Sequence, residues 1–169
     1  MNFKIFLFFL AGFFISSTVI QAQTPEQNLA KINIELPEMS KPSANFVKWR
    51  KVGNIIYLAG HGSSTKGTLG KDLTIEEGYE AARLSGINIL ATLKNAIGDL
   101  SKVKQFVSVT GMVNSAPDFY DQPKVMNGFS DLMVEVFGEK GKHARAAVGM
   151  VSLPSNIAVE IQVSVEIIE

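Results

Sequence analysis

Arg145 and Glu160 are the residues of this chain whose types and setting most suggest chemistry. Arg145 lies at the start of a segment that runs to Leu153-Pro154, and Glu160 lies in the following segment, Ala158–Val163. An arginine at the mouth of a strand can bind a carboxylate through two parallel N–H···O hydrogen bonds. A glutamate on the hairpin partner of that strand could transfer protons beside it. We therefore expect the pair to form an anion site, the alternatives being an ion-pairing arginine and a solvated carboxylate.

Three further polar residues are weaker candidates. His61 lies in a glycine-flanked segment after a predicted strand, where it could transfer protons near neutral pH, although such a residue is more often only a polar loop side chain. Asn127 lies within a predicted helix, where an exposed residue without function is an equal alternative. His143 is expected at the surface beside Lys142. The two histidines have no nearby carboxylate pattern, so no metal site is predicted.

Residues 1–22 have the pattern of a secretory signal peptide: Lys4, the uncharged apolar run Ile5–Ile15, and small residues near Ala22. The alternative is a transmembrane anchor, but the apolar run is shorter than the roughly 20 residues that a bilayer requires. We expect cleavage after Ala22 and export, to a periplasm or to the medium. The chain has no cysteine, which excludes lipoprotein anchoring, thiol catalysis and cysteine-based metal sites.

Composition indicates one globular domain after this leader. The chain has 169 residues, of which 46% are hydrophobic, enough for one core. Its 16 basic and 16 acidic residues give no net charge, so it lacks the electrostatic footprint of a nucleic-acid-binding protein. Residues 23–43 contain Pro25, Pro37 and Pro42 and are expected to be a tether and extended lead-in, and residues 44–169 the folded domain.

The first half of that domain predicts two strands and a helix. Residues 48–52 and 54–61 are expected to form strands joined at the tight-turn dipeptide Gly53-Asn54. Thr74 and Glu77 form a capping box that begins a helix, which ends at Gly98. Glycines at 78 and 86 weaken a helix interior, so we expect close packing of this helix on a sheet.

The second half predicts a strand, a helix and two closing strands. Residues 103–113 are expected to form a strand with Val103, Val107, Val109 and Val113 on one face. A second helix should run from Pro123 to Gly138, and two strands should follow, hinged at 153–156. The order β-β-α-β-α-β-β indicates an α/β (α+β) fold, a mixed sheet with two helices packed on one face. The other face should be polar, and it is a candidate subunit-contact surface.

These residues together resemble a known family. The resemblance rests on Val52–Gly60, on Ala96–Val103, and above all on Ala144-Arg145 followed by Leu153-Pro154 and Val159–Ile161. These segments are similar to the RidA family, also called YjgF/YER057c/UK114 or endoribonuclease L-PSP, over about residues 31–169. Residues 114–128 resemble a subgroup with a longer loop before the second helix.

The resemblance implies a chorismate-mutase-like fold and a homotrimer with clefts between subunits. The best-understood members hydrolyse reactive enamines and imines to 2-ketoacids and ammonia without a cofactor. By position, Arg145 would bind the carboxylate of the substrate, and Glu160 would position water or transfer protons. Gly60 would offer backbone groups, and Asn127 would lie near the cleft.

The chain departs from the imine-hydrolysing members at four positions of that site. Phe46, Ala59, His61 and Ala147 stand where those members have tyrosine, serine, glutamine and often cysteine. Loss of these hydroxyl and thiol groups removes donors from the expected pocket and supports an alternative function, a non-catalytic binder of small anionic metabolites or of a protein partner. Ribonuclease activity, suggested by the older family name, is disfavoured by the neutral charge and the absence of an aromatic-basic patch.

Overall fold

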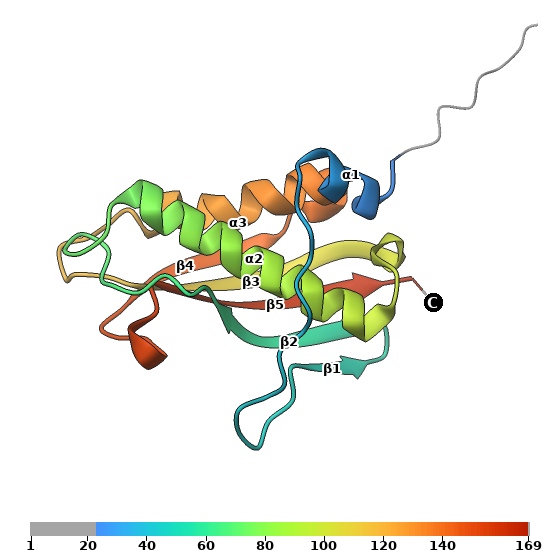
Figure 1. The fold of residues 1–169 in the computed structure, drawn as a ribbon, viewed down its shortest axis with the longest axis horizontal. Helices are drawn as coiled ribbons and strands as arrows, with labels where there is room; N and C mark the ends of the chain where they lie inside the picture. The colour runs from blue at the N-terminus through green and yellow to red at the C-terminus, as the bar shows by residue number, and fades with distance from the viewer. Residues whose placement is uncertain (1–22, 169) are drawn as a thin grey trace, which may run out of the picture.

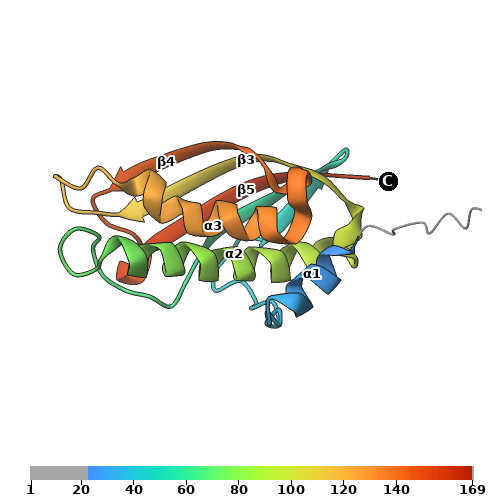
Figure 2. The same ribbon diagram turned by 90° about the horizontal axis from the view of Figure 1, so that it is seen from above.

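The computed structural model describes residues 23–168, which form a mixed five-stranded sheet with helices on one face (Figures 1 and 2). The strands are β1 (Trp49–Val52), β2 (Ile55–Gly62), β3 (Val103–Asn114), β4 (Ala144–Met150) and β5 (Val159–Ile167), in the spatial order β1-β2-β5-β3-β4. Helices α2 (Ile75–Ile97) and α3 (Gln122–Phe137) lie side by side over the sheet. The predicted fold class and element order are confirmed. The predicted signal peptide lies outside the described residues.

The sheet combines one parallel pair with three antiparallel pairs. β2 pairs with β1 and β5, and β5 pairs with β3, all antiparallel. β3 and β4 are parallel because the chain returns through α3 between them. The predicted tight turn at Gly53-Asn54 joins β1 to β2, with Gly53 at a φ of +54° that favours glycine.

The predicted buried face of β3 was wrong at one position. Two β-bulges interrupt its pairing with β5, one between Val103 and Gln105 and one between Phe106 and Ser108. Each bulge shifts the alternation of side chains between the two faces. Phe106 is therefore buried, whereas Val107, which was expected to share a face with Val103, Val109 and Val113, is 38% exposed.

The close packing expected from the helix glycines occurs between the two helices rather than on the sheet. A Cβ at Gly86 would lie 3.0 Å from Leu132 and 3.2 Å from Phe129, both on α3. A Cβ at Gly128 of α3 would overlap the carbonyl oxygen of Tyr79 on α2. The glycines therefore allow the two helix backbones to approach closely. Among residues 23–168, none of the helices combines the length and the apolar character needed to cross a membrane.

The predicted extended tether contains a helix instead, α1 (Pro25–Lys31). Thr24 caps it in a capping box with Gln27, and Pro25 occupies the first turn, where a missing N–H does no harm. The predicted tether was inferred from proline content, and Pro25 is equally suited to begin a helix. Residues 32–48 then cross α2 as an extended segment (Figure 1).

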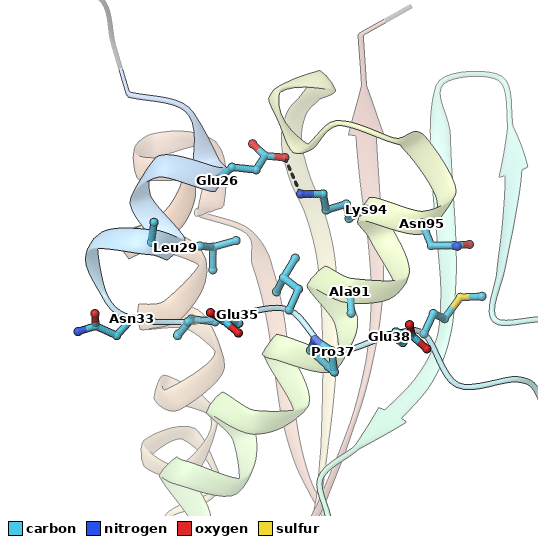
Figure 3. Close-up of a pocket in the computed structure, with 13 residues that line it drawn as sticks. Glu26, Leu29, Asn33, Glu35, Pro37, Glu38, Ala91, Lys94 and Asn95 are labelled. Carbon is cyan, nitrogen blue, oxygen red and sulfur yellow. Dashed lines mark ion pairs between the residues drawn. The ribbon is translucent and has the colours of Figure 1, made fainter.

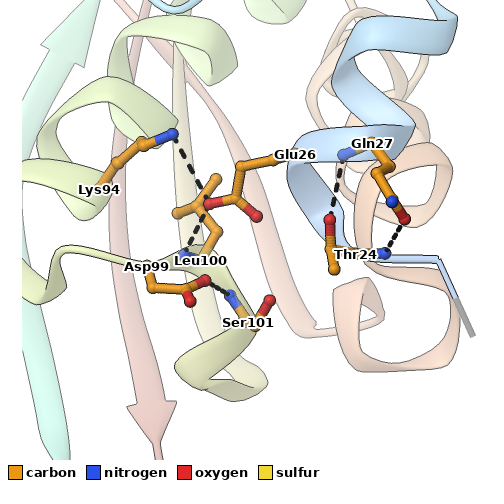
Figure 4. A network of polar contacts seen from close by, with 7 residues as sticks. All are labelled: Thr24, Glu26, Gln27, Lys94, Asp99, Leu100 and Ser101. Carbon is orange, nitrogen blue, oxygen red and sulfur yellow. Dashed lines mark hydrogen bonds and ion pairs between the residues drawn. The ribbon is translucent and has the colours of Figure 1, made fainter.

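Helix α1 is anchored by one buried side chain and a small polar network. Leu29 is 3% exposed and belongs to the core cluster. Glu26 Oε1 accepts a hydrogen bond from the backbone N–H of Leu100 at 3.0 Å and lies 3.7 Å from Lys94 Nζ (Figure 4). The carboxylate thus satisfies an N–H at the start of the turn Leu100–Lys102 and links α1 to the end of α2.

The sheet face opposite the helices is polar, as predicted. Tyr57, Ser108, Thr110, Gln162 and Ser164 line a shallow hollow of about 210 Å³ on it. Tyr57 is 51% exposed. The polar side chains of this open face can remain in contact with water in a single chain. Its hollow and the exposed ring of Tyr57 could also pack against another surface.

Candidate functional site

Arg145 extends from β4 toward α3 and binds only neutral acceptors. Its Nη1 donates to Asn127 Oδ1 at 3.1 Å and to Ser130 Oγ at 2.8 Å. Its Nη2 donates to the Pro123 carbonyl oxygen at 3.3 Å. No carboxylate within residues 23–168 forms an ion pair with it. The positive charge of Arg145 is therefore held in place but not neutralised.

The register of the sheet explains this orientation. Arg145 lies opposite Val109 of β3, which is 1% exposed on the helix-covered face. Directly paired residues share a face, so the arginine side chain also extends toward the helices. β4 is an edge strand, and no strand among residues 23–168 covers its outer side. The guanidinium thus rests on α3 and is exposed at the sheet edge.

Glu160 lies on the opposite face of the sheet. It stands between Val159 and Ile161 of β5, both buried under the helices, so its own side chain points to the open face. There its carboxylate covers Gly60 of β2, where an added Cβ would overlap Glu160 Oε1. The structure therefore brings Gly60 and Glu160 together, and only glycine leaves room for the carboxylate in this position.

The expectation that Arg145 and Glu160 lie on hairpin partners, within one site, is wrong for a single chain. β3 lies between β4 and β5, and the two side chains point to opposite faces. The cause is the connection after β4, which crosses the end of β3 instead of turning back. Asn114, the last residue of β3, fixes that connection by donating to Asn156 Oδ1 at 3.0 Å and to the Ile157 carbonyl at 3.3 Å.

His61 is buried and faces α2, away from Glu160. Its Nδ1 lies 2.7 Å from the Ala59 carbonyl oxygen, and its Nε2 lies 2.8 Å from Thr92 Oγ1. A carbonyl only accepts, so Nδ1 carries the hydrogen and Nε2 accepts from the threonine hydroxyl. Burial lowers the pKa of His61, which keeps the ring neutral. Because both nitrogens are occupied, we do not expect it to transfer protons in this arrangement.

The remaining predicted site residues supply no hydroxyl or thiol. Phe46 is 45% exposed in the segment before β1, with Lys48 Nζ 5.9 Å from its ring centre. Ala59 is half-buried and donates its backbone N–H to the Lys48 carbonyl at 2.9 Å. Ala147 shares a face with Arg145 and packs against the core. Of the predicted residues, the structure thus places Asn127 and Ala147 near Arg145 and Gly60 against Glu160, whereas the His61 side chain faces α2.

Sequence reasoning missed two residues beside the arginine. His143 was expected at the surface, but its ring is half-buried and packs edge-on against Phe129 at 5.5 Å between ring centres. Its Nε2 lies 3.1 Å from Ser130 Oγ, the same oxygen that binds Arg145. Spacing could have indicated both: residues 143 and 145 alternate onto one strand face, and Ser130 is one helical turn after Asn127. We call Arg145, Asn127, Ser130 and His143 the arginine cluster.

Four cavities described here lie away from this cluster. The largest of these four, about 1010 Å³, lies between α1, the segment after it and α2, and its lining includes Leu29, Leu36 and Lys94 (Figure 3). A cavity of about 190 Å³ is lined by Gly60, His61 and Lys48, among others. None of the cavities described here in residues 23–168 is lined by Arg145. No group of three His, Asp or Glu residues in that range could hold a metal ion.

Comparison with known proteins gives a consistent family. Residues 26–167 match the family model described as "YjgF/chorismate mutase-like, putative endoribonuclease". Protein TCP17 of Trypanosoma cruzi is 38% identical over 157 residues, covering 89% of this chain and 98% of that protein. The matched range includes every predicted site residue.

Solved structures agree with the fold. Atu1372 of Agrobacterium tumefaciens, described as of unknown function, is 40% identical with a TM-score of 0.80, covering 86% of this chain and 94% of its own. A protein from Shewanella oneidensis is 34% identical with a TM-score of 0.83, and the match covers 86% of this chain and 100% of that protein's chain. TdcF of E. coli, solved with bound serine, is 19% identical with a TM-score of 0.53, and the match covers 77% of this chain and 91% of the TdcF chain. At this identity the likeness is one of fold alone.

Proposed function

Because this chain belongs to the YjgF/chorismate mutase-like family, the RidA family, we propose that it hydrolyses a carboxylate-bearing enamine or imine to a 2-ketoacid and ammonia. The observation that carries the proposal is the state of Arg145. Three of its five N–H groups bind neutral acceptors, which leaves the N–H of Nε and one on Nη2 without a partner among residues 23–168. Two such donors on adjacent nitrogens match a carboxylate.

The two halves of the proposed site would meet between subunits. Arg145 lies at the β4 edge and Glu160 on the open sheet face, so one chain cannot bring them to one substrate. We propose a homotrimer in which the arginine cluster of one subunit approaches Glu160 and Gly60 of the next. The exposed edge of β4 and the open face are the surfaces that such an assembly would cover.

In that cleft Arg145 would bind the substrate carboxylate, and Glu160 would accept a proton from the attacking water. Water adds to the imine carbon, and the nitrogen gains the proton that Glu160 accepted. The remaining hydroxyl proton then passes to the nitrogen as the C–N bond breaks and the carbonyl forms. The products are one ketoacid and one ammonia for each imine and water consumed, so no cofactor is required. We also propose that residues 1–22 direct export and that the reaction takes place outside the cytoplasm.

The direct test is release of ammonia and ketoacid from imino acids generated enzymatically in the assay. We expect Arg145→Ala to reduce kcat/KM at least about a hundredfold, because hydrogen bonds to a charged group contribute roughly 1.5–3 kcal/mol each. Glu160→Gln should lower kcat with little change in ligand affinity. Lys71→Ala, which removes a positive charge at an exposed position in the loop before α2, is the matched control and should behave as the wild type.

Equal rates for wild type and Arg145→Ala would refute the proposal. Activity lost equally in Lys71→Ala would indicate general damage instead of a site at Arg145.

A second candidate is a non-catalytic binder of small anionic metabolites. The observations that favour it are the apolar side chains at Phe46, Ala59 and Ala147 and the fully bonded ring of His61. On this reading 2-ketoacids would raise the melting temperature of the wild type but not of Arg145→Ala, while no imine would be hydrolysed. Turnover that depends on Glu160 would exclude it.

A further inference from the structure

His143, Ser130 and Arg145 form a continuous hydrogen-bonded chain. The imidazole Nδ1 lies 2.7 Å from the Gly141 carbonyl oxygen, so Nδ1 carries the hydrogen. The neutral ring then accepts at Nε2 from the Ser130 hydroxyl, 3.1 Å away. With its hydrogen turned to the histidine, Ser130 Oγ presents its lone pairs to Arg145 Nη1 at 2.8 Å. Each donor in this hydrogen-bonded series therefore has one acceptor: His143 donates to Gly141, Ser130 donates to His143, and Arg145 donates to Ser130.

The surroundings of His143 keep it neutral and fixed. Phe129 of α3 and Phe106 of β3 lie against its ring, at 5.5 and 6.5 Å between centres. Burial lowers its pKa, and the charge of Arg145, two residues along the chain in β4, lowers it further. The charged groups of the adjacent turn Gly138–Gly141 are engaged elsewhere: Lys140 donates a hydrogen bond to the Val103 carbonyl, and Glu139 forms an ion pair with Lys142. No carboxylate among residues 23–168 binds the imidazole, and burial outweighs the hydrogen bond to the Gly141 carbonyl, which acts to raise the pKa.

We infer that Ser130 and His143 are positioning residues that hold the Arg145 guanidinium against α3, with two of its N–H groups turned outward for a carboxylate. The inference rests on the proposed function, because it specifies how the anion-binding arginine of that site is oriented. Asn127 and the Pro123 carbonyl accept two other hydrogens of Arg145, and the Ser130 hydroxyl is itself oriented by its half-buried neighbour His143. Without the histidine, the Ser130 hydroxyl could rotate and its hydrogen would compete with Arg145.

The test compares Ser130→Ala, His143→Leu and His143→Gln, each in the wild type and in Arg145→Lys, using 2-oxobutyrate as the ligand in titration calorimetry. We expect Ser130→Ala and His143→Leu to weaken binding about tenfold, the loss of roughly one charge-assisted hydrogen bond. Glutamine can accept from Ser130 through its amide oxygen, so His143→Gln should remain within about threefold of wild type. In Arg145→Lys the same changes should have less than about a twofold effect.

A second measurement needs no ligand. Rotation of the Arg145 guanidinium, followed by nitrogen NMR, should be slow in the wild type and in His143→Gln, and faster in Ser130→Ala and His143→Leu. Wild-type protein that binds no ketoacid but shows this pattern would refute the proposed function and leave the positioning role standing. The inference would be overturned if Ser130→Ala left the rotation rate unchanged. It would also be overturned if Ser130→Ala and His143→Leu weakened binding in Arg145→Lys as much as they do in the wild type.

Discussion

At the scale of single residues, the proposed function rests on the charge of Arg145, which has no counter-charge among residues 23–168. An exposed arginine usually contributes little through a surface ion pair. Arg145 instead gives three hydrogens to neutral oxygens, which restrict its motion without cancelling its field. An anion that meets it therefore does not have to displace a competing carboxylate, and less side-chain entropy is lost on binding.

The two histidines make stability depend on pH in a defined direction. Burial is the largest cause that lowers the pKa of His61 and of His143 below the ordinary value of 6.5. Between that value and the folded-state pKa, the unfolded chain binds more protons, so the free energy of unfolding falls as pH falls. Above about pH 6.5 this contribution is fully present. We expect urea unfolding to show the decline between about pH 7 and pH 5, and His61→Gln to reduce its slope.

Carboxylates affect the free energy of unfolding in a lower pH range than the histidines, so the contribution of the histidines can be measured separately. The pKa values of Asp99 and Glu166 are also lowered, the former by hydrogen bonds from Ser101 and the latter by Lys104 and Gln105. Their contributions are lost only below the ordinary carboxyl values of 3.8 and 4.5. A slope between about pH 7 and pH 5 that is the same in His61→Gln would contradict our assignment for that residue.

At the scale of elements, the helix pair α2–α3 sets where the arginine cluster stands. α3 provides Pro123, Asn127 and Ser130, and its distance from β4 depends on how closely it packs on α2. Gly128 lies on the opposite side of α3 from the solvent, with the α2 backbone at its Cα. The same helix thus uses one residue for helix packing and its immediate neighbour, Asn127, for the site.

Alanine at two helix glycines should therefore have different effects. Gly128→Ala would press a Cβ into the backbone of Tyr79, which cannot move without displacing α2, so we expect a loss of about 1–3 kcal/mol in unfolding free energy. Gly86→Ala meets only side-chain ends, at 3.0 Å or more, and gains up to ~1 kcal/mol in helix propensity. It serves as the matched control and should be nearly neutral. Equal stabilities of both variants in urea unfolding would show that the helices are free to separate.

At the scale of the whole molecule, one chain holds the two parts of the proposed site on different faces of its sheet. The arginine cluster lies at the β4 edge, and Glu160 with Gly60 lies on the open face. An unpaired edge strand next to an uncovered face is a combination that assembly commonly protects. We therefore expect function to depend on the oligomer, although the subunits fold around their own cores.

A charge on the open face should separate assembly from folding. Tyr57→Glu, at a position 51% exposed in the single chain, should give a folded monomer that no longer binds 2-oxobutyrate. Leu84→Glu, 43% exposed on α2, is the matched control and should remain trimeric. Light scattering after size exclusion gives the mass. A wild-type mass of one subunit, or full binding by a monomeric Tyr57→Glu, would contradict the proposed inter-subunit site.

The sequence by itself determined the elements and their order, because capping residues, turn glycines and apolar periodicity act over a few neighbouring positions. Thr74, Gly53 and the alternation of β5 are such local signals, and Arg145 was identifiable from its surrounding segment. Only the tertiary structure decided that β3 separates β4 from β5, that Val107 faces outward, and that His143 supports Arg145 through Ser130. Strand order, bulges and hydrogen-bonded series of side chains depend on contacts between distant segments. A one-residue shift in strand pairing also reverses the face of every side chain that follows.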